Sequence, residues 1–214
     1  MFAKRIKPYR TALIFLLTMV VLVVAYTYRL ESRRSIPAEL QGVMRPDARA
    51  LGFLTLEDQN NRAFRREDFA GKWSFVFFGY TYCPDICPMT LATLVGVNNQ
   101  LKGQADQAPD YRVIFVSVDP DRDTPEVLAS YLEYFDNKFI GLTGSKDQID
   151  TVTFQFGAGY IKESEHAPGE YLVSHTSSIF LINPEAGLVA SFSPPHDPAT
   201  IARQFRKIQR VFIE

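Results

Sequence analysis

The pattern of apolar and polar positions changes along the chain and predicts two kinds of element. Runs rich in β-branched and aromatic residues predict strands at 74–80, 112–119, 139–142, 176–182 and 188–192. Apolar residues spaced three or four apart predict helices at 88–101, 125–135, 145–156 and 198–212. The runs at 112–119 and 176–182 are nearly continuous, which is typical of strands buried on both faces of a sheet.

The order of these elements predicts one α/β domain over 46–214. Strands that alternate with helices favour a mostly parallel sheet with helices on both of its faces. The last two strands are joined by the short turn 183–187, so a hairpin is expected at that edge.

A different pattern occupies the N-terminus. Eighteen residues without a charge, 11–28, lie between Arg10 and Arg29. As a helix they would span about 27 Å, close to the thickness of a bilayer's hydrocarbon core. We expect an uncleaved transmembrane helix. A cleaved signal peptide is the alternative, but Tyr26 and Tyr28 are bulky where a cleavage site needs small residues.

The flanking charges leave the orientation of this segment nearly balanced, with four basic residues before it and three closely after it. A short tail before an adjacent anchor favours a cytoplasmic N-terminus. We therefore expect a cytoplasmic tail over 1–10, the membrane helix over 11–28 and a tether over 29–45. The polar stretch 30–50, which holds two prolines, supports the tether.

Composition and charge narrow the function. The 214 residues are 46% hydrophobic and 22% charged, which is typical of a folded domain and not of a disordered chain or a disulfide-dense miniprotein. The net charge of -1 hides a division, because residues 1–34 carry +6 and the remainder carries -7. A domain without a basic patch is not expected to bind nucleic acid.

The chain has only two cysteines, Cys83 and Cys87, and they directly follow the predicted strand 74–80. Pro88 suits the first position of a helix, which would place Cys87 at the N-cap, where the helix dipole favours a thiolate. The loop that holds the two cysteines is stiff and polar, so we do not expect them to be buried as apolar core residues. A static disulfide closing so short a loop would stabilise little. We therefore expect metal or redox chemistry.

Three histidines are candidates for a third ligand. His175 precedes the strand 176–182, and a loop there can face the first strand–helix loop across the sheet edge. Two thiolates and one imidazole suit copper, as Cu(I) or, with a further donor, Cu(II), whereas zinc needs a fourth ligand. His166 and His196 lie in polar loops and are interpreted as solvated, and Met89 is interpreted as a packing residue.

Three alternate aspartates, Asp119, Asp121 and Asp123, have the spacing that begins a calcium-binding loop. Such a loop needs glycine at its sixth position and glutamate at its twelfth, where this chain has Thr124 and Ser130. Calcium is therefore excluded. We expect Asp123 or Thr124 to cap the helix that follows.

The runs FFGYTYCPDICPMT, VSVDPDRDTPEVLASYLEYF and YLVSHTSSIFLINPEAG closely resemble the Sco/SenC family of membrane-tethered copper chaperones. The resemblance extends over nearly all of 46–214. Its CxxxC-P motif with a distant histidine is specific, because ordinary thioredoxins carry CxxC. The resemblance implies an α/β, thioredoxin-like fold, with a central mixed sheet flanked by helices and preceded by one transmembrane helix. It also implies that Cys83, Cys87 and His175 bind one copper ion per chain.

Two positions depart from the pattern of the family. Tyr82 stands where many members have histidine or phenylalanine. Ser174 stands where many have an acid beside the histidine. The second departure predicts a weaker orientation of His175, because neighbouring hydrogen bonds orient metal-binding histidines.

The family assists assembly of the binuclear copper centre of cytochrome c oxidase by delivering copper, by reducing the receiving cysteines, or both. The resemblance therefore implies the copper-centre subunit as a partner, together with a copper donor protein and a thiol reductant. It places the chain in a bacterial inner membrane with its domain in the periplasm, and it does not predict a conventional enzyme. The alternative is a tethered thiol–disulfide oxidoreductase or redox sensor, in which Cys83 attacks and Cys87 resolves. A peroxidase of the same fold would need a pocket spacing that this sequence lacks.

Overall fold

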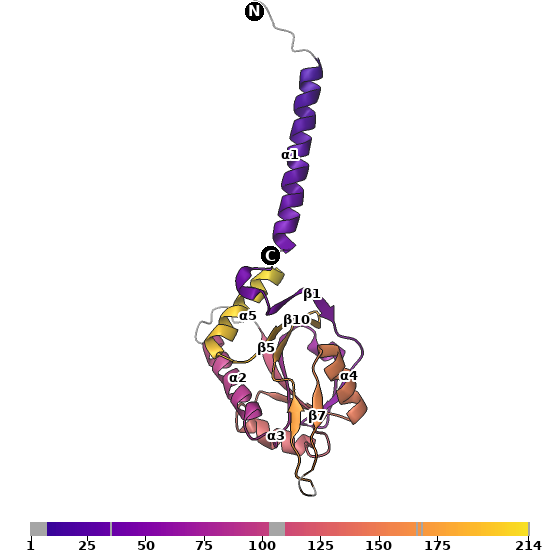
Figure 1. Ribbon diagram of the computed structural model, residues 1–214, viewed down its shortest axis with the longest axis vertical. Helices are drawn as coiled ribbons and strands as arrows, with labels where there is room; N and C mark the ends of the chain where they lie inside the picture. Colours follow the sequence, from indigo (N-terminus) through magenta and orange to yellow (C-terminus); the bar gives the residue numbers. More distant parts are fainter. Residues whose placement is uncertain (1–7, 35, 103–109, 166, 168, 214) are drawn as a thin grey trace, which may run out of the picture. The chain divides into compact units, whose positions relative to one another are not determined.

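The computed structural model describes residues 8–34, 36–102, 110–165, 167 and 169–213 (Figure 1). The chain divides into two compact units, Met1–Ala38 and Glu39–Glu214. The first contains helix α1 (Pro8–Arg34), which covers the segment 11–28 and exposes the apolar side chains between Leu13 and Tyr26. Within the described residues, no helix combines the length and the apolar character that a membrane crossing requires.

The second unit is built on an eight-stranded sheet with the strand order β1-β10-β9-β4-β5-β6-β2-β3. In that order the strands are Met44–Ala50, Gly187–Phe192, Ile179–Ile182, Trp73–Gly79, Tyr111–Ser117, Ile140–Thr143, Thr55–Asp58 and Ala63–Arg65. Each of the five predicted strands has a counterpart.

The sheet is mixed, and the expectation of a mostly parallel sheet was wrong. Only β4, β5 and β6 pair in parallel, and the other neighbours are antiparallel. The predicted hairpin between β9 and β10 is present. It does not form the edge of the sheet, because β1 pairs with the outer side of β10. β1 lies in the polar stretch 30–50, whose sequence shows no strand pattern.

Four helices cover the sheet: α2 (Ile86–Lys102), α3 (Pro125–Glu133), α4 (Lys146–Phe156) and α5 (Pro198–Ile213). Two short 3₁₀ helices, η1 (Ala38–Leu40) and η2 (Arg66–Phe69), precede β1 and follow β3. α2 and α5 lie on one side of the sheet and α4 lies on the other (Figure 1). The right-handed crossover rule applies to α2, which joins the parallel strands β4 and β5, and to α3, which joins β5 and β6, so it places these two helices on the same face.

Strand β4 is the centre of the hydrophobic core, since all seven of its residues are buried. Its side chains alternate between the two faces of the sheet. Phe75 packs against Phe205 of α5, with ring centroids 4.9 Å apart. Phe78 packs on the opposite face against Phe156 of α4, at 5.1 Å. The end of β4 at Gly79 is therefore held firmly from both sides, and the cysteine loop begins there.

A separate two-stranded ribbon carries His175. Strands β7 (Tyr160–Lys162) and β8 (Val173–His175) pair antiparallel, with Tyr160 opposite His175. The sequence pattern placed His175 directly before a long strand. In the structure it ends β8, and residues 176–178 separate it from β9.

Candidate metal centre

The loop after β4 places the two cysteines in different surroundings. Cys83 lies in the loop and is partly exposed, whereas Cys87 lies in the first turn of α2 and is fully buried. The backbone N–H of Cys87 donates to Cys83 Sγ at 3.4 Å. α2 begins at Ile86, so the expectation that Cys87 is the N-cap and Pro88 the first helical residue was wrong. Pro88 still lies in the first turn, where the missing N–H has no helical partner to lose.

Gly79 leaves the space that Cys87 needs. A Cβ atom at this position would lie 2.7 Å from Cys87 Sγ and 2.8 Å from Cε2 of Phe115. Any side chain would therefore push the buried sulfur away from the end of β4. The absence of a side chain at Gly79 lets Cys87 Sγ lie directly over the strand.

His175 presents its Nε2 atom to the cysteines. Nε2 lies 3.3 Å from Cys87 Sγ, and Nδ1 lies 3.2 Å from the carbonyl oxygen of Thr176. A Nδ1–H that donates to this carbonyl leaves the Nε2 lone pair directed at the sulfurs. The ring also packs edge-on against Phe77 at 5.8 Å and Tyr80 at 5.9 Å.

The neighbouring Ser174 does not orient this ring. Its hydroxyl donates to Glu163 Oε1 at 2.6 Å, on the exposed side of the ribbon. The Thr176 carbonyl and the two aromatic rings orient His175 instead. The structure therefore supplies the orientation that the sequence predicted to be weak.

The ligand atoms of Cys83, Cys87 and His175 all lie within 4.8 Å of one another, so together they form a group that can hold a metal ion. Two sulfurs and one imidazole nitrogen are soft donors, and this donor set fits copper. His196 is not part of the group, since its Nε2 lies 2.8 Å from the Ser177 carbonyl oxygen. His166 lies outside the described residues.

Met89 also lies outside the group of three ligands. The sequence predicted a packing residue, but the Met89 side chain is 57% exposed.

The two thiols differ in acidity. A hydrogen bond from Cys87 lowers the pKa of Cys83 to about 3, although burial acts in the opposite direction. The hydrogen bond with Cys83, together with burial, raises the pKa of Cys87. The thiolate therefore resides on Cys83 and the proton on Cys87. The sequence predicted the thiolate at Cys87, but Cys83 is the sulfur that receives the helix N–H group.

The buried carboxylate of Asp123 holds the start of the cysteine loop by hydrogen bonds. Asp123 accepts hydrogen bonds from the Thr81 amide at 3.0 Å, the Thr81 hydroxyl at 2.5 Å and the Ser117 hydroxyl at 2.6 Å. Burial raises the pKa of Asp123, although these hydrogen bonds act in the opposite direction. Of the two predicted helix caps only Thr124 is one, because its side chain accepts from Val127 N. No motif in the sequence signals the role of Asp123.

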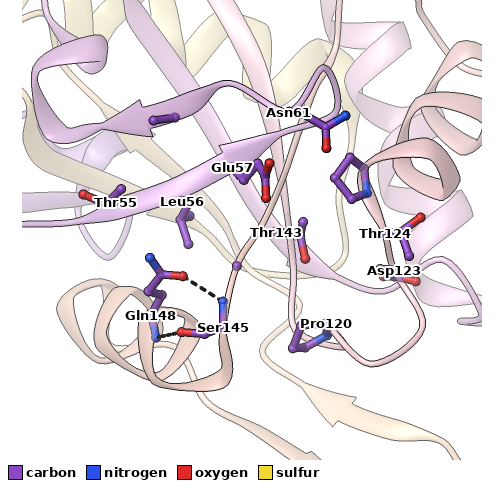
Figure 2. Close-up of a pocket in the computed structure, with 13 residues that line it drawn as sticks. Thr55, Leu56, Glu57, Asn61, Pro120, Asp123, Thr124, Thr143, Ser145 and Gln148 are labelled. Carbon is purple, nitrogen blue, oxygen red and sulfur yellow. Dashed lines mark hydrogen bonds between the residues drawn. The ribbon is translucent and has the colours of Figure 1, made fainter.

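A cleft of about 530 Å³ lies near the first turns of α3 and α4 (Figure 2). Its lining includes Asp123 and Thr124 but none of the three candidate ligands. Figure 2 shows Ser145 and Gln148 exchanging hydrogen bonds between side chain and backbone, as a capping box does. These polar groups are thus used to begin α4.

The fold and the group of three ligands define a class of protein: an α/β domain that presents a soft-metal or thiol-exchange site at the start of a helix. The SCO1/SenC family model matches residues 43–210, and the chain belongs to this family. It is 36% identical over 152 residues to the SCO2-like protein of Rickettsia felis, covering 70% of this chain and 72% of that protein.

Two solved structures extend the likeness to three dimensions. The crystal structure of Arabidopsis thaliana ScoI with copper bound is 33% identical, with a TM-score of 0.69 over 74% of this chain and 97% of that one. The structure of Bradyrhizobium japonicum ScoI with copper bound is also 33% identical, with a TM-score of 0.65 over 74% and 98%. The thioredoxin-like fold with a central mixed sheet is thereby confirmed.

Proposed function

We propose that the chain binds one copper ion through Cys83 Sγ, Cys87 Sγ and His175 Nε2 and delivers it to the copper centre of cytochrome c oxidase during assembly. The observation that carries the proposal is the convergence of these three soft donors within 4.8 Å. The family membership and the copper held by two of its solved structures support the same conclusion.

The two cysteines differ in exposure and ionisation, and this difference suits a metal ion that is taken up and later transferred to a partner. Cys83 is already a thiolate and partly exposed, so it can accept copper from a donor protein or yield it to a receiving site. Cys87 must lose its proton when it ligates the metal, so uptake releases a proton. The partners in this proposal are the copper-centre subunit of the oxidase, a copper donor and a thiol reductant that keeps the pair open.

We also propose that residues 11–28 anchor the chain in a bacterial inner membrane, with the domain over 46–214 in the periplasm. The support is the uncharged run itself and the exposed apolar side chains of α1. In this arrangement 1–10 is the cytoplasmic tail, and the tether lies within 29–45, whose last residues already belong to the compact unit that begins at Glu39.

Copper titration against a competing chelator tests the copper-binding proposal. Reduced protein, kept without air, is expected to bind one tight equivalent of Cu(I), and His175→Ala is expected to weaken binding by at least tenfold. His196→Ala is the matched control, because His196 lies outside the ligand group. Weak binding that does not depend on His175 would overturn the proposal.

A second function is favoured by one observation, the low pKa of the partly exposed Cys83. Its thiolate can attack a partner disulfide, forming a mixed disulfide and releasing one partner thiolate. Cys87, after losing its proton, then attacks Cys83 Sγ, which closes the Cys83–Cys87 disulfide and releases the second partner thiol. Two electrons pass from the cysteine pair to the partner. His175→Ala separates the two functions, since disulfide exchange should tolerate this change and copper binding should not.

A further inference from the structure

The position of His175 poses a structural problem. The ribbon β7–β8 is a sheet of its own, and among the described strands it pairs with none of the eight-stranded sheet. One side of the ribbon is tied to α4, where the Tyr160 hydroxyl donates to Asp150 Oδ1 at 2.6 Å. This contact does not reach the cysteine loop. His175 packs against Phe77 and Tyr80, and Lys162 of β7 pairs with Asp121 at 3.8 Å. Arg122 makes further contacts between this part of the chain and the cysteine loop.

Arg122 binds the backbone of the segment that leads into strand β8 of the ribbon. Its Nη1 donates to the carbonyl oxygen of Tyr171 at 3.1 Å and, more weakly, to that of Gly169 at 3.4 Å. Its Nε donates to Asp119 Oδ2 at 2.5 Å. The other oxygen of Asp119 accepts the Tyr171 hydroxyl at 2.6 Å. One buried carboxylate therefore holds both Arg122 and the side chain of Tyr171, which lies two residues before β8.

The same guanidinium also contacts the cysteine loop. Its Cζ lies 3.6 Å from the ring centroid of Tyr171, 4.8 Å from that of Tyr82 and 5.7 Å from that of Tyr80. Tyr82 directly precedes Cys83 in the chain. The Arg122 side chain is only 16% exposed and that of Asp119 is 4% exposed, so these contacts are largely shielded from water. A cation stacked on aromatic faces is held more strongly where it is desolvated.

Arg122 thus joins three segments: the turn after β5, the cysteine loop and the ribbon that ends at His175. We propose that Arg122 is a positioning residue that clamps the ribbon to the cysteine loop and so sets the distance between His175 Nε2 and the two sulfurs. This inference rests on the proposed copper-binding function. It adds the residue that assembles the three ligands from separate parts of the chain.

A double-mutant cycle tests the clamp. Arg122→Gln removes the charge and the fork of donors, and is expected to weaken Cu(I) binding by the full-length chain about tenfold. In a His175→Ala background the same change is expected to alter affinity by less than about twofold, because the histidine that it positions is gone. Equal losses in the two backgrounds would show a general structural effect and overturn the proposal.

Arg112→Gln is the matched control. Arg112 also stacks near two aromatic rings, Phe64 and Phe69, and bonds Ser74 Oγ, but it contacts none of the metal-centre residues. It is expected to leave copper affinity unchanged. If Arg122→Gln fails to fold, Tyr171→Phe removes only the hydroxyl bond to Asp119 and is expected to weaken copper binding in the same direction by a few-fold.

Hydrogen exchange of the copper-free protein separates failure of the clamp from failure of the copper proposal. In Arg122→Gln the amides of 160–175 are expected to exchange at least several-fold faster, while those of β4 keep their rates. Unchanged exchange over 160–175 would overturn the clamp even if wild-type copper binding depends on His175. Faster exchange in a chain that binds no copper would support the clamp and reject the copper function alone.

Discussion

At the scale of single residues, the two cysteines have different tasks. Cys83 is partly exposed and ionised, and Cys87 is buried and protonated. The difference arises from the start of α2, where the N–H of Cys87 and the thiol of the same residue both direct hydrogen bonds at Cys83 Sγ. A single turn of helix therefore makes one nucleophile and one proton donor from two identical side chains.

This difference predicts selective alkylation at low pH. In the copper-free, reduced chain, iodoacetamide is expected to modify Cys83 and to leave Cys87 unmodified while the protein is folded. Because the pKa of Cys83 is lowered to about 3, its rate should change little between pH 8 and pH 5, whereas an ordinary thiol slows about tenfold per unit below its pKa. Both cysteines lie in the tryptic peptide 73–102, so tandem mass spectrometry, which locates the modified residue within the peptide, measures both rates.

Cys87→Ala is the informative variant for this experiment. It removes the largest cause of the low pKa, so the alkylation rate of Cys83 should become more dependent on pH. A wild-type rate that falls with acidity as a free cysteine does would contradict the assignment of the thiolate.

The sequence could predict the three ligands but not the residues that hold them. Cys83, Cys87 and His175 are recognisable from their chemistry and from the family motif. Asp123 belongs to a group of three alternate aspartates whose spacing resembles the start of a calcium-binding loop. Only the fold shows that it accepts hydrogen bonds from Thr81. Arg122 is similar, because its partners come from three separate segments. Such roles depend on contacts between distant parts of the chain, which a local pattern does not contain.

At the scale of elements, burial decided which strands could be predicted. β4, β5 and β9 are covered on both faces, and their continuous apolar runs revealed them. β2, β3, β7 and β8 are only three or four residues long and partly exposed, so their own residues carry little signal. They are strands because a partner supplies the hydrogen bonds, and the sequence pattern does not identify that partner.

The β2–β3 hairpin offers a test of such a locally built element. Asp58 accepts the backbone N–H groups of Asn60 at 2.8 Å and Arg62 at 3.0 Å, and its other oxygen binds the Arg62 guanidinium. Burial raises the pKa of Asp58, but the hydrogen bonds from Arg62 and Asn60 outweigh it and lower the pKa overall. The stabilisation is therefore complete above the unfolded value of about 3.9 and is lost as the pH falls through the folded pKa.

We expect Asp58→Asn to lower the free energy of unfolding by about 1 kcal/mol at pH 7, because the amide keeps the backbone contacts but loses the charge. The difference from wild type should shrink as the pH falls below about 3.9, because the unfolded chain then binds the proton that folded Asp58 binds only below its lowered pKa. Urea denaturation between pH 2.5 and pH 7 measures it. Asp110→Asn, which breaks an exposed pair with Lys72, is the control and should show almost no effect. A constant difference at every pH would contradict the prediction.

At the scale of the whole molecule, the chain combines a negatively charged compact domain with a positively charged N-terminal unit. Residues 1–34 carry +6 and the rest carries -7. The proposed anchor predicts that the full chain stays with membranes after carbonate extraction, and that deletion of 11–28 releases a soluble domain. Western blotting of the two fractions measures this. Release of the full chain by carbonate would contradict the anchor. It would leave the copper-binding proposal unaffected, because the copper titration tests that proposal independently.

The ribbon that carries His175 has a consequence for the lifetime of bound metal. In the described part of the chain, β7 and β8 form no strand pairing with the main sheet. Their movement away from the cysteines therefore breaks none of the backbone hydrogen bonds between the strands of that sheet. The cost of freeing one ligand is then a local opening energy, smaller than the energy that unfolds the domain. Affinity and release rate can therefore be tuned at the ribbon by substitutions that leave global stability unchanged.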